Sequence, residues 1–342
     1  MNFGFFHLAT HVFSVRMINM KVAVLGCGRW ASFNAWYQSN ILKNDTLMYG
    51  RADSEHYQGL SKTRKNAYLK LPKAVKFTDN LKKALDFADH IIIAISAQGM
   101  KELSEEISTF DPTGKFFILC MKGIIDDTGE RLSEVLAKHI DTKSNKIVAW
   151  VGPGHAQELS AGKPNVMLIA SEDQIAAAHI RNAFKSKLIR FYESDDLIGA
   201  EIGAAAKNVL GIIAGLLDGA ELSSLKGALM ARGVYEVAKL IVAMGGNHLT
   251  AYGISHLGDF EATLFSQNSH NRRFGEMLHK GEHNNDLAEG VSTSKALHLL
   301  AEKYNVEMPI SRLCYQIVHE GKDNKEGLKE LFERDFAKEF RF

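Results

Sequence analysis

A single lysine inside a long apolar stretch is the residue whose position most clearly suggests chemistry. Between Ile202 and Leu217, Lys207 and Asn208 are the only polar side chains. A helix that is apolar on all sides is usually buried, and a buried ammonium needs a partner or loses its charge. Such a lysine can stabilise a developing oxyanion and deliver a proton to it. The structural alternative is a core helix from which the lysine reaches water with its tip.

Glycines recur on the same stretch. Gly203, Gly211, Gly215 and Gly219 stand at multiples of four residues from Lys207, so they would form a slowly drifting stripe along a helix. Each glycine inside a helix costs about 1 kcal/mol relative to alanine. We therefore expect another backbone, or a ligand, to lie close to this stripe.

Polar residues farther along the chain could complete a site around the lysine. Asp259 is the candidate partner of Lys207, because a nearby carboxylate offsets burial and favours the charged ammonium. Ser269, His270 and Asn271 are followed by two arginines, and a guanidinium binds phosphate with two parallel hydrogen bonds. We predict that this segment is an anion-binding loop; the alternative is a capped helix start with two solvated arginines.

A glycine-rich segment near the N-terminus has the pattern of a dinucleotide-binding turn. Residues 21–25 form an apolar run that predicts a buried strand, and Gly26, Gly28 and Ala31 then fill the small positions of the G-x-G-x-x-G/A pattern. Residues 32–42 predict a helix whose first amides would face the phosphates of NAD or NADP. The flanking strand and helix are what make this pattern informative.

Two other strand ends carry side chains that could contact a dinucleotide. Residues 46–49 predict the second strand, and Arg51 and Asp53 follow it. An arginine here suits the 2′-phosphate of NADP and an acid suits the ribose of NAD, so the order favours NADP without excluding NAD; a solvated turn is the alternative. Lys122 follows the predicted strand 115–119, where a phosphate or nicotinamide would lie, although it could also be a surface lysine.

Strands and helices alternate through the first half of the chain. This alternation predicts an α/β fold with a Rossmann-like, doubly wound, mostly parallel sheet that binds ligands at the carboxyl ends of its strands. After Asp195 the helical patterns dominate, which predicts an all-α C-terminal domain. We therefore divide the chain into an N-terminal arm (1–20), a dinucleotide-binding domain (21–194) and a helical substrate-binding domain (195–342).

Composition argues against several classes of protein. The net charge of +1 gives no general attraction to nucleic acid or to anionic membranes. Three scattered cysteines fit a reducing, cytoplasmic setting better than a disulfide framework, and no apolar run is long enough to predict a membrane span. For the first twenty residues we expect an upstream start codon or a short arm rather than a signal peptide.

Two histidines have the spacing of a metal-binding pair. His279 and His283 stand four residues apart, but Gly281 lies between them and two asparagines follow. These residues argue against a helix there, so we predict no metal site.

Taken in order, these segments resemble the bacterial NAD(P)-dependent glycerol-3-phosphate dehydrogenases. The similarity runs from about Lys21 to about Gly327. Besides the glycine turn, it is carried by Asn66–Leu69, Leu71-Pro72, Met121–Gly123, Gly152-Pro153, Ala204–Asn208, Ala231–Gly233, Gly258-Asp259, Asn271–Gly275, Glu289-Gly290 and Glu307–Ile310.

The resemblance implies an activity and roles for individual residues. The family reduces dihydroxyacetone phosphate to sn-glycerol 3-phosphate, the backbone of phospholipids, with NADPH or NADH. By position, Lys207 resembles the catalytic proton donor and acceptor. The substrate-binding candidates are Lys122, Gly152, Gly154, Lys207, Asp259, Ser269, His270 and Asn271. The cofactor-binding candidates are Gly26, Gly28, Arg29, Trp30, Arg51, Lys122, Ala156, His270, Leu287 and Glu289.

Three positions depart from the family pattern. Gly154 stands where the family usually has serine or threonine, His270 where it has a phosphate-binding arginine, and Ser96-Ala97 where it has a proline–serine pair. Replacing a phosphate-binding arginine is not conservative, although a protonated His270 could partly substitute or Arg272 could move in. These departures put the efficiency and phosphate specificity in question more than the fold.

Three functions are therefore open, and the first is favoured. The chain could be a competent glycerol-3-phosphate dehydrogenase, a related two-domain dehydrogenase acting on another small carbonyl or hydroxy compound, or a non-catalytic dinucleotide-binding descendant. Lys122, Lys207 and Asp259 argue against the last. We expect a small-molecule substrate and no nucleic-acid or membrane partner; a homodimer is plausible from base rates only.

Overall fold

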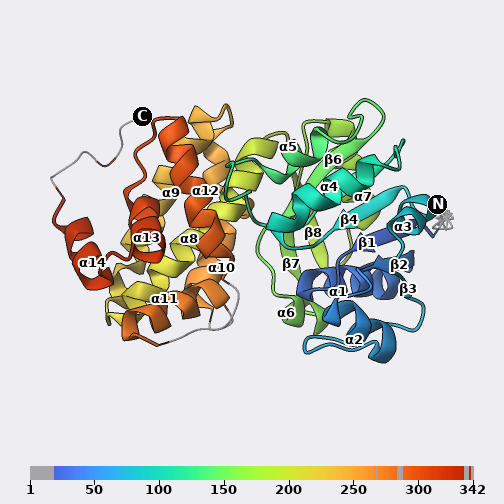
Figure 1. The fold of residues 1–342 in the computed structure, drawn as a ribbon, viewed down its shortest axis with the longest axis horizontal. Coiled ribbons are helices and arrows are strands. Elements are labelled where there is room, and N and C mark those ends of the chain that lie inside the picture. Colours follow the sequence, from blue (N-terminus) through green and yellow to red (C-terminus); the bar gives the residue numbers. More distant parts are fainter. Residues whose placement is uncertain (1–18, 267–268, 283–287, 335–338, 340–342) are drawn as a thin grey trace, which may run out of the picture.

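The computed structural model describes residues 19–266, 269–282, 288–334 and Glu339. Figure 1 shows two halves side by side, one built on a sheet covered by helices and the other made of helices. The sheet half comes first in the chain, and the long helix that follows the last strand begins the second half.

The sheet has eight strands in the order β3-β2-β1-β4-β5-β6-β7-β8. Neighbouring strands from β3 to β6 are parallel, whereas β7 runs antiparallel to β6 and parallel to β8. The mostly parallel, Rossmann-like sheet is therefore confirmed. The bounds are β1 (Lys21–Leu25), β2 (Asp45–Tyr49), β3 (Lys76–Thr78), β4 (His90–Ile93), β5 (Phe116–Leu119), β6 (Lys146–Val151), β7 (Asn165–Ala170) and β8 (Ile189–Ser194).

Alternate residues of the central strands feed two apolar cores, one on each face of the sheet. Val22 and Val24 of β1 pack in one core, whereas Ala23 and Leu25 pack in the other. The covering helices are α1 (Arg29–Trp36), α2 (Glu55–Thr63), α3 (Leu81–Phe87), α4 (Met100–Ser108), α5 (Leu132–Ala137), α6 (Ala156–Ser160) and α7 (Gln174–Phe184), with a π-helical turn, η1 (Tyr37–Ile41), and a 3₁₀ turn, η2 (Ala97–Gly99).

The helical half is built around α8 (Leu197–Gly219), which lies at its centre in Figure 1. This helix is long and apolar enough to cross a membrane, but 89% of its apolar window is buried inside the protein, as expected of a core helix. The other helices are η3 (Ser223–Leu225), α9 (Lys226–Ala243), η4 (His248–Tyr252), η5 (Ile254–Gly258), α10 (Asp259–Phe265), α11 (His270–Lys280), α12 (Glu289–Lys303), α13 (Pro309–His319) and α14 (Asn324–Phe332).

The glycine stripe of α8 is covered by another backbone, as predicted. A Cβ atom added at Gly215 would lie 1.9 Å from the carbonyl oxygen of Arg272 on α11, and one added at Gly219 would lie 3.0 Å from the carbonyl oxygen of Glu276. Near the other end of the stripe, Gly203 faces the side chain of His256. The two helices α8 and α11 can touch only because these positions lack side chains.

Three of the differences from the sequence prediction bear on the sheet and on the candidate site. The helix expected over 32–42 begins earlier, at Arg29, and its last part widens into the π-helical turn. The short strand β3 and the helix α2 were not predicted. The segment from Ser269 is no loop, because Ser269 accepts a hydrogen bond from the backbone of Arg272 and caps α11. The prediction of a loop was therefore wrong. The alternative was right about the cap but wrong about Arg272, whose side chain is 13% exposed and pairs with Asp218 and Glu276.

Candidate active site

The glycine turn after β1 lies where the strand order reverses. β1 lies between β2 and β4, and open parallel sheets bind dinucleotides at such a point. Gly26 has φ 121° and an added Cβ would lie 2.4 Å from the carbonyl oxygen of Ala94, so only glycine fits. A Cβ at Gly28 would meet no atom within 4 Å. This open face at the start of α1 fits the pyrophosphate of NAD or NADP.

Lys207, Asp259 and Lys122 form one buried charge cluster, although the sequence separates them widely. Nζ of Lys207 donates to Oδ1 of Asp259 at 3.0 Å, and Nζ of Lys122 donates to Oδ2 at 2.6 Å. The side chains are 12%, 3% and 17% exposed for Lys207, Asp259 and Lys122. The carboxylate is thus shared by two ammonium groups, one from α8 and one from the end of β5.

The charges of the cluster oppose the effect of burial. Burial alone would raise the pKa of Asp259, but the two ammonium groups hold it below its ordinary value. Burial lowers the pKa of Lys122 despite the attraction of Asp259. Lys122 also donates from Nζ to the carbonyl oxygen of Gly152 at 2.7 Å. The cluster therefore contains two nearby cationic groups and one anion in surroundings with little water.

Amide side chains connect this cluster to the other helices. Nδ2 of Asn208 donates to the carbonyl oxygen of Lys122 at 2.9 Å and lies 3.4 Å from Oε2 of Glu289. Asn271 donates to Oδ1 of Asn208 at 3.0 Å, and the backbone of Gly290 donates to Oδ1 of Asn271. This network holds α8, α11 and the start of α12 against the loop that follows β5.

Glu289 carries a carboxyl group beside the cluster. Part of its surface is exposed to solvent. The protein around the carboxyl group nevertheless raises its pKa, and the positive charges of Lys207, Lys122 and Arg29 only partly oppose this effect. Glu289 therefore interacts electrostatically with cations from both halves of the molecule.

A second contact joins the halves at the glycine turn. Nη2 of Arg29, the first residue of α1, touches Nε2 of His270, the first residue of α11. The guanidinium also lies 4.6 Å from the ring centre of Tyr68. Two predicted site residues that are 241 positions apart therefore meet directly.

Most of the remaining predicted residues lie just after the carboxyl ends of strands. Gly154 lies beside the ring of Trp30, where an added Cβ would be 3.6 Å away, and Ala156 begins α6. Arg51 stands apart: its exposed side chain lies 3.7 Å from Asp53 and 3.5 Å from Glu102. The prediction for Leu287 falls outside the described residues, as does the arm over residues 1–18.

The sequence prediction missed two polar residues of the cluster. Oγ1 of Thr263 accepts from Nζ of Lys207 at 3.0 Å; its signal was its spacing four residues after Asp259, which places both on one face of α10. His155 follows Gly154 after β6, and burial, reinforced by the Lys207 ammonium, lowers its pKa.

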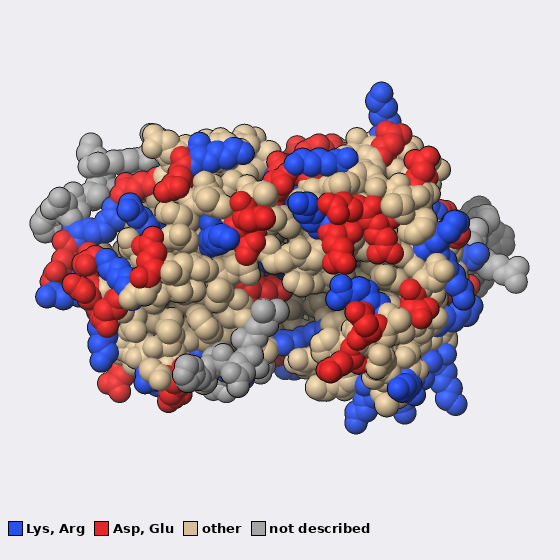
Figure 2. Space-filling model, in the orientation of Figure 1, with Lys and Arg blue, Asp and Glu red and all other residues tan. Residues whose placement is uncertain are grey.

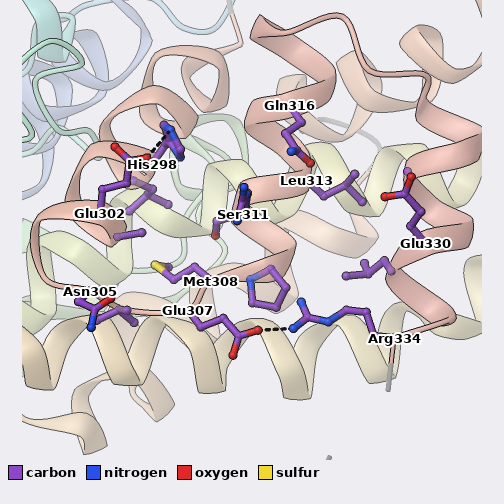
Figure 3. A pocket seen from close by; sticks show the side chains of 17 residues that line it. His298, Glu302, Asn305, Glu307, Met308, Ser311, Leu313, Gln316, Glu330 and Arg334 are labelled. Atoms are coloured by element: carbon purple, nitrogen blue, oxygen red, sulfur yellow. Dashed lines mark hydrogen bonds and ion pairs between the residues drawn. The ribbon is translucent and has the colours of Figure 1, made fainter. Parts of the chain in front are cut away.

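Hollows of the surface lie both between the two halves and within the helical half. Figure 2 shows one between the two halves, with Lys or Arg side chains beside it. Another, of about 600 Å³, lies among α12, α13 and α14 (Figure 3). An ion pair between Glu307 and Arg334 lies at this second hollow. The hollow is lined by none of the predicted site residues. The candidate active site is therefore the junction between the halves.

Comparison with known protein families covers almost the whole chain. Residues 21–177 match the family model described as NAD-dependent glycerol-3-phosphate dehydrogenase N-terminus, and residues 196–329 match the model of its C-terminus. The junction that contains the charge cluster is thus formed by the two regions that these models describe.

Individual relatives agree over nearly their full lengths. A protein of Exiguobacterium sp. named glycerol-3-phosphate dehydrogenase, NAD(P)+, is 34% identical over 92% of this chain and 95% of its own. A protein of the same name from Listeria innocua is 34% identical over 93% and 97%. The crystal structure of glycerol-3-phosphate dehydrogenase from Coxiella burnetii superposes with a TM-score of 0.86, at 26% identity, over 92% of this chain and 99% of that one.

Proposed function

The chain belongs to the NAD-dependent glycerol-3-phosphate dehydrogenase family, and we propose that it reduces dihydroxyacetone phosphate with the ammonium of Lys207 as proton donor. The observation that supports this role is the buried ion pair between Lys207, which lies on the core helix α8, and Asp259. The same carboxylate also pairs with Lys122. A non-catalytic protein would not need this cluster, whereas a related enzyme for another carbonyl compound would use it in the same way.

Proton delivery is the part of the reaction that these residues can perform. When NADPH or NADH is bound, its nicotinamide supplies the hydride. As the carbonyl oxygen of the substrate gains negative charge, the ammonium of Lys207 stabilises it and transfers a proton to it. Asp259 and Thr263 both accept hydrogen bonds from this ammonium and so fix its direction.

Lys122 provides a second positive charge for the same oxygen. Its Nζ is held by Asp259 and by the carbonyl oxygen of Gly152, and it lies just past β5, at the edge of the sheet where the nicotinamide would bind. Asn271, Ser269 and Gly154 are our candidates for the substrate side, whereas Gly26, Gly28, Trp30 and Ala156 are those for the cofactor side. Arg51 is the candidate for the 2′-phosphate of NADP.

A steady-state assay tests this function directly. We expect the purified protein to oxidise NADPH or NADH when dihydroxyacetone phosphate is added, and Lys207→Ala to lower kcat at least about 1,000-fold. Lys325→Ala removes an exposed lysine on α14 and is the control expected to leave turnover unchanged. Normal turnover by Lys207→Ala would refute the role of that lysine.

A panel of small carbonyl compounds separates the alternatives. Faster turnover of an unphosphorylated 2-oxo compound would favour the second enzyme function, and cofactor binding without turnover of any compound would favour the non-catalytic one. The panel run with both cofactors also measures the preference that Arg51 is expected to set toward NADP.

The setting of the reaction belongs to the same proposal. The product is a phospholipid precursor, so we place the enzyme in lipid biosynthesis in the cytoplasm, acting as a homodimer. We also place the boundary of the two domains near Asp195, between the end of β8 at Ser194 and the start of α8 at Leu197. Light scattering of the purified protein, and separate expression of residues 21–194, would test the dimer and the boundary.

A further inference from the structure

The contact between Arg29 and His270 brings together the first residues of two helices from different halves of the molecule. The N-terminus of a helix carries a partial positive charge that favours anions. Here the side chains of the first residues of α1 and α11 meet. The guanidinium of Arg29 adds a full charge at that point.

The chemistry of the contact shows which side chain carries the charge. A guanidinium can only donate hydrogen bonds, so Nε2 of His270 must be the acceptor in this contact. The imidazole that accepts at Nε2 is neutral and carries its proton on Nδ1. The cation at the start of α11 is therefore supplied by Arg29 from the nucleotide-binding half, and His270 orients it.

The guanidinium is held in place from the other side as well. It lies against the ring of Tyr68, at 4.6 Å from the ring centre, which is within the range of a cation–π contact. The segment carrying Tyr68 is fastened to α1, because Nδ2 of Asn66 donates to Oγ of Ser32 at 2.9 Å. Asn66 also accepts from the backbone of Tyr68 at 2.9 Å. These contacts orient the guanidinium of Arg29 toward α11.

The guanidinium of Arg29 therefore points toward the part of the junction where we expect the substrate to bind. His270 precedes Asn271, which belongs to the amide network around Lys122 and Glu289. An anion bound there would meet two opposing charges, that of Asp259 between the two lysines and that of Glu289, whose pKa the surrounding protein raises against the charges of Lys207, Lys122 and Arg29. The three cations outnumber these carboxylates by one.

We propose that Arg29 binds the phosphate group of the substrate, reaching it across the junction from the nucleotide-binding half. This inference rests on the proposed reduction of dihydroxyacetone phosphate. The N–H groups of the guanidinium that His270 does not use can donate to phosphate oxygens, and a guanidinium pairs with phosphate through two parallel bonds. Because the same loop carries Gly26 and Gly28, substrate and cofactor would be bound by one turn of the chain.

Four proteins test the proposal: the natural chain, Arg29→Gln, Arg29→Gln with His270→Arg, and Lys70→Ala. Lys70 is an exposed cation two residues from Tyr68 and controls for general charge. We expect Arg29→Gln to raise the KM for dihydroxyacetone phosphate roughly 10- to 100-fold. It should change kcat/KM for unphosphorylated dihydroxyacetone less than about twofold. The double variant, which restores a guanidinium from the opposite side, should recover most of the loss, and Lys70→Ala should behave as the natural chain does.

Calorimetry distinguishes whether Arg29 binds the phosphate of the substrate or the phosphates of the cofactor. Inorganic phosphate should bind the natural chain and bind Arg29→Gln at least about tenfold more weakly, whereas the Kd for NADPH should be nearly the same for both. A weaker Kd for NADPH with an unchanged KM for dihydroxyacetone phosphate would overturn the proposal and assign Arg29 to the cofactor. Equal losses for phosphorylated and unphosphorylated substrates would also overturn it. If the natural chain turns over neither substrate, the proposed function fails, but phosphate binding still decides the role of Arg29; thermal unfolding of each variant confirms that it is folded.

Discussion

The central residue-scale feature is a carboxylate shared by two ammonium groups. Asp259 is 2% exposed and contacts Lys122 and Lys207 within 3.0 Å. Removing one partner of a buried pair usually costs more than the pair contributed, because a charge is left without compensation. Removing the charge of Asp259 should therefore lower the activity more than removing the hydroxyl of Thr263.

Asp259→Asn tests this balance without changing the shape of the site. The neutral amide leaves two buried ammonium groups facing each other, and one of them can then lose its proton more readily. We expect kcat to fall about 100-fold and the alkaline limb of the pH–rate profile to move to lower pH. Thr263→Val, which removes only one hydrogen bond, should lower kcat much less; equal effects of the two variants would contradict the shared-carboxylate explanation.

A different buried carboxyl group, far from the active site, should make stability depend on pH. Glu236 on α9 accepts from the backbones of Ile310 and Ser311 and from the Ser311 hydroxyl, at 2.6–3.0 Å. Burial raises its pKa from 4.5 to about 7. Because the folded pKa lies above the unfolded one, the contribution of Glu236 to stability is fully present below pH 4.5 and is lost as the pH rises through about 7.

Glu236→Gln removes this titration. The loss in the natural chain is on the order of 3 kcal/mol, so the variant should gain stability relative to the natural chain as the pH rises from 5 to 8. Urea unfolding at several pH values measures the difference. A constant difference across this range would show that Glu236 does not titrate as its burial implies.

The sequence located the catalytic candidates better than it located their neighbours. Lys207 was conspicuous because a charge in an apolar helix is costly, and Lys122 because it follows a buried strand. Thr263 and His155 have no such cost, since a hydroxyl or a neutral imidazole is common in a protein interior. The contact of Arg29 with His270 could not be predicted, because nothing local relates residues 241 positions apart.

At the scale of elements, the packing of α8 against α11 depends on missing side chains. Gly215 faces the carbonyl oxygen of Arg272, and Gly275 of α11 reciprocally faces the carbonyl oxygen of Ile212, 2.0 Å from an added Cβ. The glycines lower the intrinsic stability of both helices, but they let two backbones approach and place Asn271 beside Asn208.

Gly215→Ala should therefore destabilise the protein although alanine favours helices. The added methyl group would overlap the backbone of α11 and force the helices apart, at a cost of about 1–3 kcal/mol, and it should also lower kcat by displacing Asn271. Gly227→Ala is the matched control, because Gly227 lies exposed in the neighbouring helix α9 with no atom within 4 Å of an added Cβ. This control should stabilise by roughly 0.5 kcal/mol. Similar stability changes in the two variants would contradict the close-approach argument.

Elements were predictable from the sequence where burial imposes a pattern. β1, β4 and β5 are nearly continuous apolar runs because both faces of the sheet are covered. β3 has only three residues and lies at the edge, so it leaves almost no pattern. The start of α11 looked like a loop because its first residues are polar, although serine followed by polar residues is also how a helix begins.

At the scale of the whole molecule, a second buried ion pair fastens the sheet half to α8. Nη1 of Arg131 donates to Oε2 of Glu201 at 2.8 Å, and the backbone and hydroxyl of Ser133 donate to the same carboxylate. Both charged side chains are at most 7% exposed. Arg131 lies just before α5, whereas Glu201 lies six residues before Lys207 on the same helix, so this pair fixes the position of Lys207 relative to the sheet.

Breaking this pair should loosen the connection between the halves. Arg131→Met leaves the carboxylate of Glu201 buried with only the donors of Ser133, and such a change typically costs about 3–5 kcal/mol. The double variant Arg131→Met with Glu201→Leu removes both charges and should recover most of that stability, because an apolar pair of similar volume avoids the cost of burying ions.

Calorimetric unfolding should show the natural chain and the double variant unfolding at higher temperatures than the single variant. If both variants lose equal stability, the pair contributes through its specific geometry rather than through the uncompensated charge; if neither loses any, the pair does not hold the halves together.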